Sequence, residues 1–253
     1  MPDPRHIAIT GASSGIGAAL AVAYAAPGIL LSLAGRDTAR LSTVAQACRD
    51  AGAETSVTAF DVTEPAAAAR WINHADDRLP IDLAIANAGI SAGTGGGDET
   101  AEQTRAILQV NFDGVSNVIL PAVEHMRSRR RGQVAIMSSL AGFIGMPGAP
   151  AYCASKATVR VWGEALRAEL ATDGIGVSVI CPGFVRSPMT DVNRFPMPFL
   201  MEADRAARMI IAGLARNKGR IAFPLPMYLA VRAIAALPAW LRERVLRLAP
   251  RKP

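Results

Sequence analysis

Cysteine is scarce in this chain of 253 residues, with only Cys48, Cys153 and Cys181, widely spaced along the sequence. An odd number of cysteines without zinc-type pairs argues against a disulfide framework and gives no metal site. This usage favours a reducing compartment, and we expect a cytoplasmic protein. The first residues also lack the basic segment, apolar run and cleavage site of a secretion signal, so we expect none.

Charged residues are also few, at 19%, whereas hydrophobic residues make up 51% of the chain. This balance excludes a disordered chain and supplies one large core. The net charge of +6 could attract nucleic acid or anionic lipid. However, no aromatic side chains interleave with the arginine run at 127–131 as stacking platforms for bases. We therefore expect that run to be a solvated loop and expect no nucleic-acid partner.

No repeat, low-complexity tract or linker divides the sequence, and we expect one domain over residues 1–253. Apolar runs alternate with helical patterns along it. Strands are predicted at 7–10, 29–34, 55–60, 83–86, 133–138, 176–181 and 221–223, and helices at 15–26, 38–51, 64–76, 100–127 and 151–172. Continuous apolar strands linked by helices predict an α/β fold, a doubly wound parallel sheet of about seven strands covered on both faces. Ligands of such sheets bind beyond the carboxyl ends of the strands.

The first strand-to-helix turn reads T-G-A-S-S-G-I-G and holds Gly11, Gly15 and Gly17. Gly11 allows a tight turn, Gly15 lets backbone approach a pyrophosphate, and Gly17 lets the helix pack close to the sheet. The helix N-terminus adds N–H donors and a positive dipole end. Such a turn could be a packing device only, but its place after the first strand favours a dinucleotide site.

Tyr152 and Lys156 are four residues apart in a predicted helix, so the phenol and the amine lie on one face. A nearby positive charge can lower the pKa of a tyrosine from ~10 toward neutrality. The spacing alone also fits a helix edge that packs a ring and solvates an amine. Lys156 is one of only three lysines, and an arginine could not release a proton in its place.

Taken in order, the motifs resemble the short-chain dehydrogenase/reductase family. They are the glycine turn, Asn87-Ala88-Gly89 after the fourth strand, Asn111, Ser139 thirteen positions before Tyr152, Lys156, and Pro182-Gly183 after the sixth strand. The resemblance covers about residues 7–187. It implies a Rossmann-type fold and an oxidoreductase that transfers a hydride between a nicotinamide cofactor and a carbonyl or secondary alcohol. It also implies a homodimer or homotetramer built through the two long helices.

The resemblance further implies roles for four residues. Tyr152 would be the general acid/base, and Lys156 would lower the pKa of Tyr152 and hydrogen-bond the nicotinamide ribose. Ser139 would hold the substrate oxygen, and Asn111 would anchor a water that passes protons to Lys156. Asn111 alone could equally be a polar residue at a helix kink, and the neighbouring Ser138 could close the strand end.

A larger set of cofactor contacts follows from the same resemblance. The expected cofactor-binding residues are Gly11, Ser13, Ser14, Gly15, Ile16, Gly17, Arg36, Asp61, Val62, Asn87, Ala88, Gly89, Tyr152, Lys156, Pro182, Gly183, Val185 and Ser187. Asp61 could instead cap the helix that follows it. No metal is expected.

The end of the second predicted strand favours NADP(H) over NAD(H). Gly35 stands where an acidic residue would accept hydrogen bonds from the ribose hydroxyls of NAD, and Arg36 follows it. A guanidinium can grip a 2'-phosphate through paired hydrogen bonds. Against this, Asp37 is adjacent and could take the acidic role, and Ser14 stands where many NADP-using relatives carry a basic residue.

The segment 184–201 resembles the substrate loop of the family. Its apolar residues are Met189, Phe195, Met197, Phe199, Leu200 and Met201, and they suit a small apolar carbonyl or alcohol substrate. They could equally pack the loop onto the core.

The C-terminal extension, 224–253, is apolar and basic. Residues 221–241 hold one charge, Arg232, but three prolines argue against a membrane span. Beyond them, Leu241, Val245 and Leu248 share a helical face beside arginines, which is typical of peripheral contact with the inner face of a membrane. The tail could equally cover its own core or a neighbouring subunit. An alternative function is a catalytically idle NADP-binding sensor or scaffold, although the four candidate catalytic positions hold competent residues.

Overall fold

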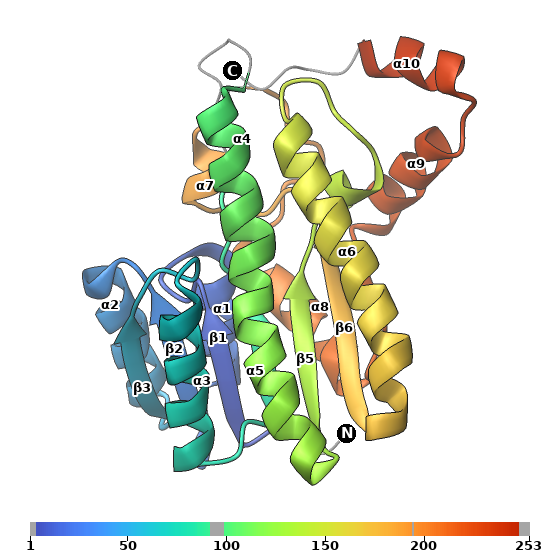
Figure 1. The fold of residues 1–253 in the computed structure, drawn as a ribbon. Helices are drawn as coiled ribbons and strands as arrows, with labels where there is room; N and C mark the ends of the chain where they lie inside the picture. The colour runs from blue at the N-terminus through green and yellow to red at the C-terminus, as the bar shows by residue number, and fades with distance from the viewer. Residues whose placement is uncertain (1–3, 92–98, 194, 248–253) are drawn as a thin grey trace.

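The computed structural model describes residues 4–91, 99–193 and 195–247. Seven parallel strands form one sheet in the order β3-β2-β1-β4-β5-β6-β7 (Figure 1). They are β1 (His6–Thr10), β2 (Leu30–Gly35), β3 (Glu54–Ala59), β4 (Leu83–Ala86), β5 (Gly132–Met137), β6 (Ile175–Pro182) and β7 (Arg220–Phe223). The predicted fold class is confirmed, and each predicted strand lies within two residues of its observed bounds.

Helices cover both faces of the sheet. One face carries α1 (Gly15–Tyr24), α2 (Thr38–Asp50) and α8 (Ala203–Ala215), and the other carries α3 (Pro65–Arg78), α5 (Gly114–Arg129) and α6 (Pro150–Leu170). Successive side chains of β1 point to opposite faces, so Ile7 and Ile9 join one core while Ala8 joins the other. A dry core on each side holds the strand ends, and therefore the site, in fixed positions.

The helix predicted at 100–127 is interrupted. It consists of α4 (Ala101–Leu108), a π-helical turn η1 (Gln109–Asp113) and α5. The whole run is long and apolar enough to cross a membrane, but 44% of its most apolar stretch is buried, and α5 packs on α3 and the sheet as a core helix does. Residue Asn111 lies in the π turn and is fully buried.

Three short helices and a bridge follow β6 and β7 on the side of the predicted substrate loop. After β6, the chain forms α7 (Pro188–Asp191), and Met201 then pairs with Val185 in an isolated bridge. After β7, the chain forms α9 (Leu225–Ala235) and α10 (Ala239–Arg247), which project beyond the body of the molecule at the end of the sheet where the strands finish (Figure 1). The apolar stretch 221–241 is thus divided among a strand and two short helices.

Candidate functional site

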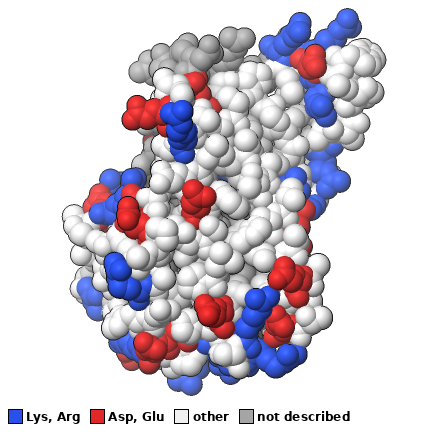
Figure 2. Space-filling view, in the orientation of Figure 1, with Lys and Arg blue, Asp and Glu red and all other residues white. Residues whose placement is uncertain are grey.

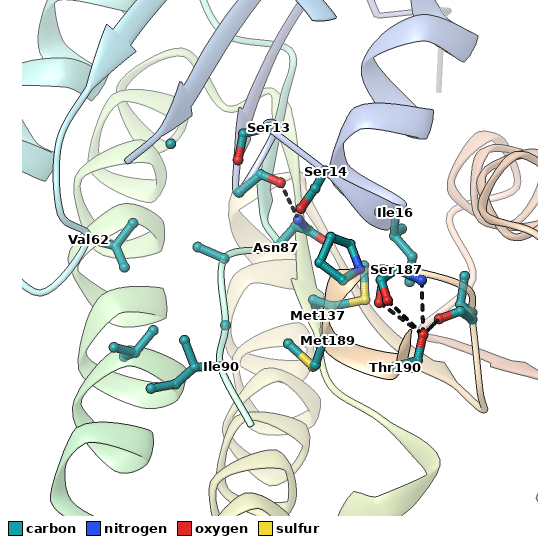
Figure 3. A pocket seen from close by; sticks show the side chains of 18 of the residues that line it. Ser13, Ser14, Ile16, Val62, Asn87, Ile90, Met137, Ser187, Met189 and Thr190 are labelled. Carbon is teal, nitrogen blue, oxygen red and sulfur yellow. Dashed lines mark hydrogen bonds between the residues drawn. The ribbon is translucent and has the colours of Figure 1, made fainter. Parts of the chain in front are cut away.

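A cavity of about 360 Å³ lies at the carboxyl ends of β1, β2, β4, β5 and β6 (Figure 3). All predicted cofactor-binding residues except Gly17 line it, as do Ser139, Tyr152 and Lys156 of the four predicted catalytic residues. Gly17 and Asn111 are not among the lining residues, and both have packing roles close behind it.

The glycine turn is fastened to the end of β4 by Asn87. Its side-chain amide donates to the carbonyl oxygens of Thr10 (3.0 Å) and Gly11 (3.2 Å). A Cβ on Gly17 would lie 2.2 Å from the Gly11 oxygen, and one on Gly11 would lie 2.9 Å from the Ala88 backbone. No side chain other than hydrogen therefore fits at either glycine, and the backbone itself forms the cradle that a dinucleotide phosphate requires.

The N-terminus of α1 opens into this cradle. Ser14 is the N-cap residue, and its side chain makes no capping hydrogen bond, so it leaves the first N–H groups of the helix to another acceptor. Opposite, Ser187 closes the cavity, because a Cβ on Gly15 would lie 3.0 Å from the Ser187 Cβ. Ser187 is itself held by Thr190, whose hydroxyl accepts from the Ser187 N–H at 2.9 Å (Figure 3). The donors and the space fit an anionic pyrophosphate.

At the end of β2, Asp37 is already engaged. One carboxylate oxygen accepts from the Arg40 N–H (3.0 Å) as the cap of α2, and the other accepts from Arg40 Nε (2.5 Å). Arg36 is exposed, with Nη1 3.7 Å from an oxygen of Asp61. Burial raises the pKa of Asp61, but hydrogen bonds from Thr63 and the charge of Arg36 outweigh it and hold that pKa below its usual value. Arg40, absent from the predicted set, also lines the cavity and lies in the first turn of α2.

Asp61 lies in the turn before α3 and at the wall of the cavity, so its adenine contact stays a prediction and the alternative that it caps the helix is wrong. One oxygen accepts from the N–H and the hydroxyl of Thr63, each at 2.9 Å, which shapes the turn before α3. Its side chain also lines the cavity beside Val62. The cap residue of α3 is Glu64 rather than Asp61.

Ser139, Tyr152 and Lys156 converge from β5 and α6. The Ser139 hydroxyl accepts from the Ala141 N–H (3.1 Å) and lies in hydrogen-bond contact with Tyr152. Lys156 Nζ donates to the Met137 carbonyl oxygen (3.0 Å) and lies 5.8 Å from the centre of the Tyr152 ring. The three side chains thus share one corner of the cavity, where Ser139 and Lys156 are buried and Tyr152 is half-buried.

Burial dominates the titration of this corner. It raises the pKa of Tyr152 above its usual value, against a lowering hydrogen bond with Ser139, and it lowers the pKa of Lys156 to about 8. Burial of the phenol therefore sets the direction of its pKa in this structure, and the lowering of that pKa by Lys156 stays a prediction. Desolvation disfavours phenolate and ammonium alike. A neutral phenol and a lysine that titrates near neutrality result.

Asn111 braces the site from behind. Its side-chain oxygen accepts from the Ile90 N–H (2.8 Å), and its amide nitrogen donates to the Ile90 carbonyl (2.9 Å) and to the Ser155 hydroxyl (2.9 Å). The side chain therefore joins the segment after β4 to α6. The π turn that places it there matches the alternative of a polar residue at a helix irregularity. Ser138 is likewise structural, because its hydroxyl donates to the Lys156 carbonyl at 2.7 Å.

A second cavity, of about 290 Å³ and mostly apolar, adjoins the first and shares with it Ser139, Tyr152, Gly183, Met189 and Thr190. The segment 184–201 contributes Phe184, Met189, Thr190, Asn193, Phe195, Pro196 and Pro198, and α9 contributes Met227 and Val231. Some apolar residues of this segment lie at the cavity, as a substrate loop requires, and others pack onto the core. Met189 and Phe195 line the cavity, Met201 is buried in the core, and Phe199 is exposed. Met227 and Val231 carry no sequence signal beyond being apolar.

The chain matches proteins of known family over most of its length. Residues 5–196 match the family model for short chain dehydrogenases. An uncharacterized oxidoreductase of Myxococcus xanthus is 36% identical over 235 residues, which cover 92% of this chain and 93% of that protein. An uncharacterized oxidoreductase of Mycobacterium tuberculosis is 34% identical over 245 residues, covering 95% and 96%.

Among solved structures, a short-chain dehydrogenase from Sphingobium yanoikuyae in complex with NADPH superposes with a TM-score of 0.80 at 27% identity, over 98% of this chain and 97% of that chain. The seven-stranded parallel sheet flanked by helices agrees with these matches. This chain therefore belongs to the short-chain dehydrogenase family of oxidoreductases.

Proposed function

We propose that this protein is an NADP(H)-dependent reductase or dehydrogenase acting on the carbonyl or secondary alcohol of a small apolar substrate, with Tyr152 as general acid/base. The observation that carries the proposal is the position of Tyr152 and Ser139, which line the dinucleotide cavity and the apolar cavity at once. A substrate oxygen placed between those hydroxyls would have apolar walls on one side and the cofactor site on the other.

Residues of the first cavity would hold the cofactor. The glycine turn and the α1 N-terminus would take the pyrophosphate, Asp61 and Val62 the adenine side, and Lys156 the nicotinamide ribose. Asn87, Ala88 and Gly89, with Pro182, Gly183, Val185 and Ser187, would form the remaining walls. The nicotinamide supplies or accepts the hydride.

A preference for NADP(H) is supported by the end of β2. Arg36 and Arg40 both line the cavity beyond Gly35, and the carboxylate of Asp37 is held by Arg40 and by the cap of α2. Two guanidinium groups, with Asp37 already engaged by Arg40, favour a 2'-phosphate over bare ribose hydroxyls. The solved structure of the similar Sphingobium protein is a complex with NADPH.

Side chains of the protein would then transfer the proton that the reaction requires. In the reducing direction, the neutral Tyr152 phenol donates its proton to the substrate oxygen as negative charge develops there, and the Ser139 hydroxyl holds that oxygen. Lys156, with a pKa of about 8, can replace the proton on Tyr152 near neutral pH. Asn111 keeps α6, and therefore Tyr152 and Lys156, at a fixed distance from the turn after β4. Oxidation of an alcohol reverses the proton movement.

Replacing Tyr152 by Phe tests this role. Screening a panel of carbonyls and alcohols by nicotinamide absorbance would first identify a substrate. We expect Tyr152→Phe to reduce turnover by roughly 10²-fold or more while NADPH binding is kept. Tyr24→Phe, at the end of α1 and outside both cavities, is the matched control and should retain full turnover. Unchanged turnover in Tyr152→Phe would contradict the mechanism and favour the idle NADP-binding sensor or scaffold.

We also propose a cytoplasmic homodimer or homotetramer, with peripheral contact between the 224–253 extension and the inner face of a membrane. Exposed Leu120 on α5 and exposed Val161 on α6 supply apolar contacts on the two long helices that would join the subunits. Light scattering would give the subunit number, and charged substitutions at these two positions should reduce it.

A further inference from the structure

Helix α9 is fixed to the body of the protein by one face. Tyr228 stacks edge-on against Phe143, with ring centres 5.4 Å apart, and its hydroxyl accepts from Arg220 Nη1 at 3.0 Å. Met227 and Val231, on the same side, line the apolar cavity. The Met227 sulfur lies so close to Gly183 that a Cβ there would be 2.9 Å from it. The inner face of α9 is therefore a wall of the proposed substrate site.

The outer face of the helix pair is apolar and open. Leu225 and Leu229, one turn apart on α9, are 61% and 57% exposed, and Trp240 in the first turn of α10 is 62% exposed. Single exposed apolar residues are ordinary on a protein surface. Three large ones on two adjoining short helices form instead a candidate contact surface.

Basic side chains accompany this surface. Helix α10 holds Arg242, Arg244 and Arg247 against the single acidic residue Glu243. Arg232 of α9 instead donates to the Tyr228 hydroxyl at 3.2 Å, on the side of the body. Figure 2 shows the basic side chains gathered over these helices. The Arg244 guanidinium lies 5.7 Å from the centre of the Trp240 ring, so cation and apolar anchor are adjacent. Exposed apolar anchors beside arginines match a helix that lies at the interface of an anionic bilayer.

We propose that α9 and α10 bind an anionic lipid surface and that the enzyme takes its apolar substrate from that layer. Lipid binding rests on the outer face alone, whereas the uptake of substrate rests on the proposed function. Because α9 is a single helix between the lipid-facing surface and the cavity, Leu225 and Leu229 contact acyl chains on one side while Met227 and Val231 contact substrate on the other.

Vesicle binding tests the lipid contact without requiring activity. The full chain is mixed with vesicles of phosphatidylcholine alone or with phosphatidylglycerol, and binding is followed by co-sedimentation and tryptophan fluorescence. Trp71 is buried and Trp162 is partly buried, so a blue shift on binding reports mainly Trp240. We expect binding and a blue shift with phosphatidylglycerol vesicles only.

Matched variants identify the surface. Leu229→Ser with Trp240→Ser should weaken binding about tenfold or more, whereas Val22→Ser on α1, 46% exposed, should not. Arg244→Glu with Arg247→Glu should abolish the preference for anionic vesicles, unlike Arg205→Glu with Arg208→Glu on α8. Circular dichroism and NADPH binding verify that each variant is folded.

Three results would overturn the proposal. They are no binding to anionic vesicles, equal binding of the tail variants and their controls, and self-association through Leu229 and Trp240 without vesicle binding, which would assign the surface to a second copy of the chain. Tyr152→Phe should bind vesicles as the native protein does, so a failure of the catalytic proposal is distinguishable from a failure of this one. Vesicle-bound enzyme should also reduce a lipid-dissolved carbonyl faster than the Leu229→Ser, Trp240→Ser variant, with equal rates on a water-soluble one.

Discussion

The Lys156 ammonium donates to the Met137 carbonyl oxygen over 3.0 Å, so the middle of α6 is joined to the last residue of β5. Lys156 is 3% exposed, and burial lowers its pKa to about 8. Burial removes water from the charged ammonium, and this desolvation costs free energy in the folded state. Below pH 8, where Lys156 is charged in both the folded and the unfolded chain, it therefore lowers the free energy of unfolding.

Replacing this lysine should stabilise the protein at neutral pH. Because the pKa is about 8 in the folded chain and 10.5 ordinarily, the native protein gains stability as pH rises between those values. In Lys156→Met, removal of the desolvation cost should raise the free energy of unfolding at pH 7 by roughly 3 kcal/mol. Loss of the hydrogen bond to Met137 should lower it by about 1 kcal/mol, so the variant should be more stable overall. The advantage should shrink above pH 8 and vanish near pH 10.5.

Urea unfolding at several pH values measures the difference in stability between the native protein and Lys156→Met. Lys218→Met, at an exposed position, is the control. A Lys156→Met variant less stable than the native protein at pH 7 would contradict the prediction.

Cofactor preference should depend on Arg36 and Arg40. Losing a charge-assisted hydrogen bond to a 2'-phosphate costs about 1.5–3 kcal/mol, so Arg36→Leu or Arg40→Leu should weaken NADPH binding by roughly tenfold or more. NADH binding should hardly change, whereas Arg70→Leu on α3 should leave both unchanged. Titration with each cofactor measures the effect. Tighter binding of NADH than NADPH by the native protein would end this interpretation.

Gly17 should tolerate no side chain. A Cβ there would lie 2.2 Å from the Gly11 oxygen and 2.5 Å from Asn87 Nδ2, and both belong to the cradle. Gly17→Ala should lower the free energy of unfolding by about 1–3 kcal/mol and weaken dinucleotide binding. Gly145→Ala, where a Cβ has nothing within 4 Å, is the control. Equal stability of the two variants would mean that the turn yields more easily than its geometry indicates.

The apolar cavity should set substrate choice. Phe195→Ala and Met227→Ala remove cavity walls, and each should reduce kcat/KM for an apolar substrate by an amount equivalent to about 1–3 kcal/mol. Affinity for NADPH should stay the same. Phe199→Ala lies in the same segment but is exposed, and it should have little effect. If Phe199→Ala impairs turnover as much as Phe195→Ala, the segment contributes through its folding rather than through contact.

The parts of the fold that follow from local patterns were predictable. Most strands are apolar runs, with the edge strand β3 (Glu54–Ala59) as a polar exception. The glycine turn, Tyr152 and Lys156 lie at fixed spacings, so sequence order alone brought them to the carboxyl edge of the sheet. Helix α8 was not predicted, although its buried residues Ala206, Ala207, Ile210 and Leu214 follow helical spacing.

What escaped prediction depends on contacts between distant residues. The engagement of Asn111 by Ile90 and Ser155 needs the folded backbone to be seen. That of Asp37 by Arg40 is a local helix cap, which an aspartate three residues before an arginine could have indicated. The pKa of Tyr152 also followed burial, which the spacing to Lys156 does not encode. In segment 184–201, apolar character alone could not separate Met201 in the core from Phe195 at the cavity.

The π turn η1 changes which side chains of the α4–α5 run face the same direction. An α-helix rotates about 100° per residue, and a π turn accommodates about one residue more than an α-helical turn would. That residue lets Asn111 face the segment after β4 while Val115 and Val118 still face the sheet. Deleting one residue between Leu108 and Gly114 would turn one of these groups away from its partners. The length of the chain from α4 to α5 is therefore fixed as strictly as the identity of any residue in it.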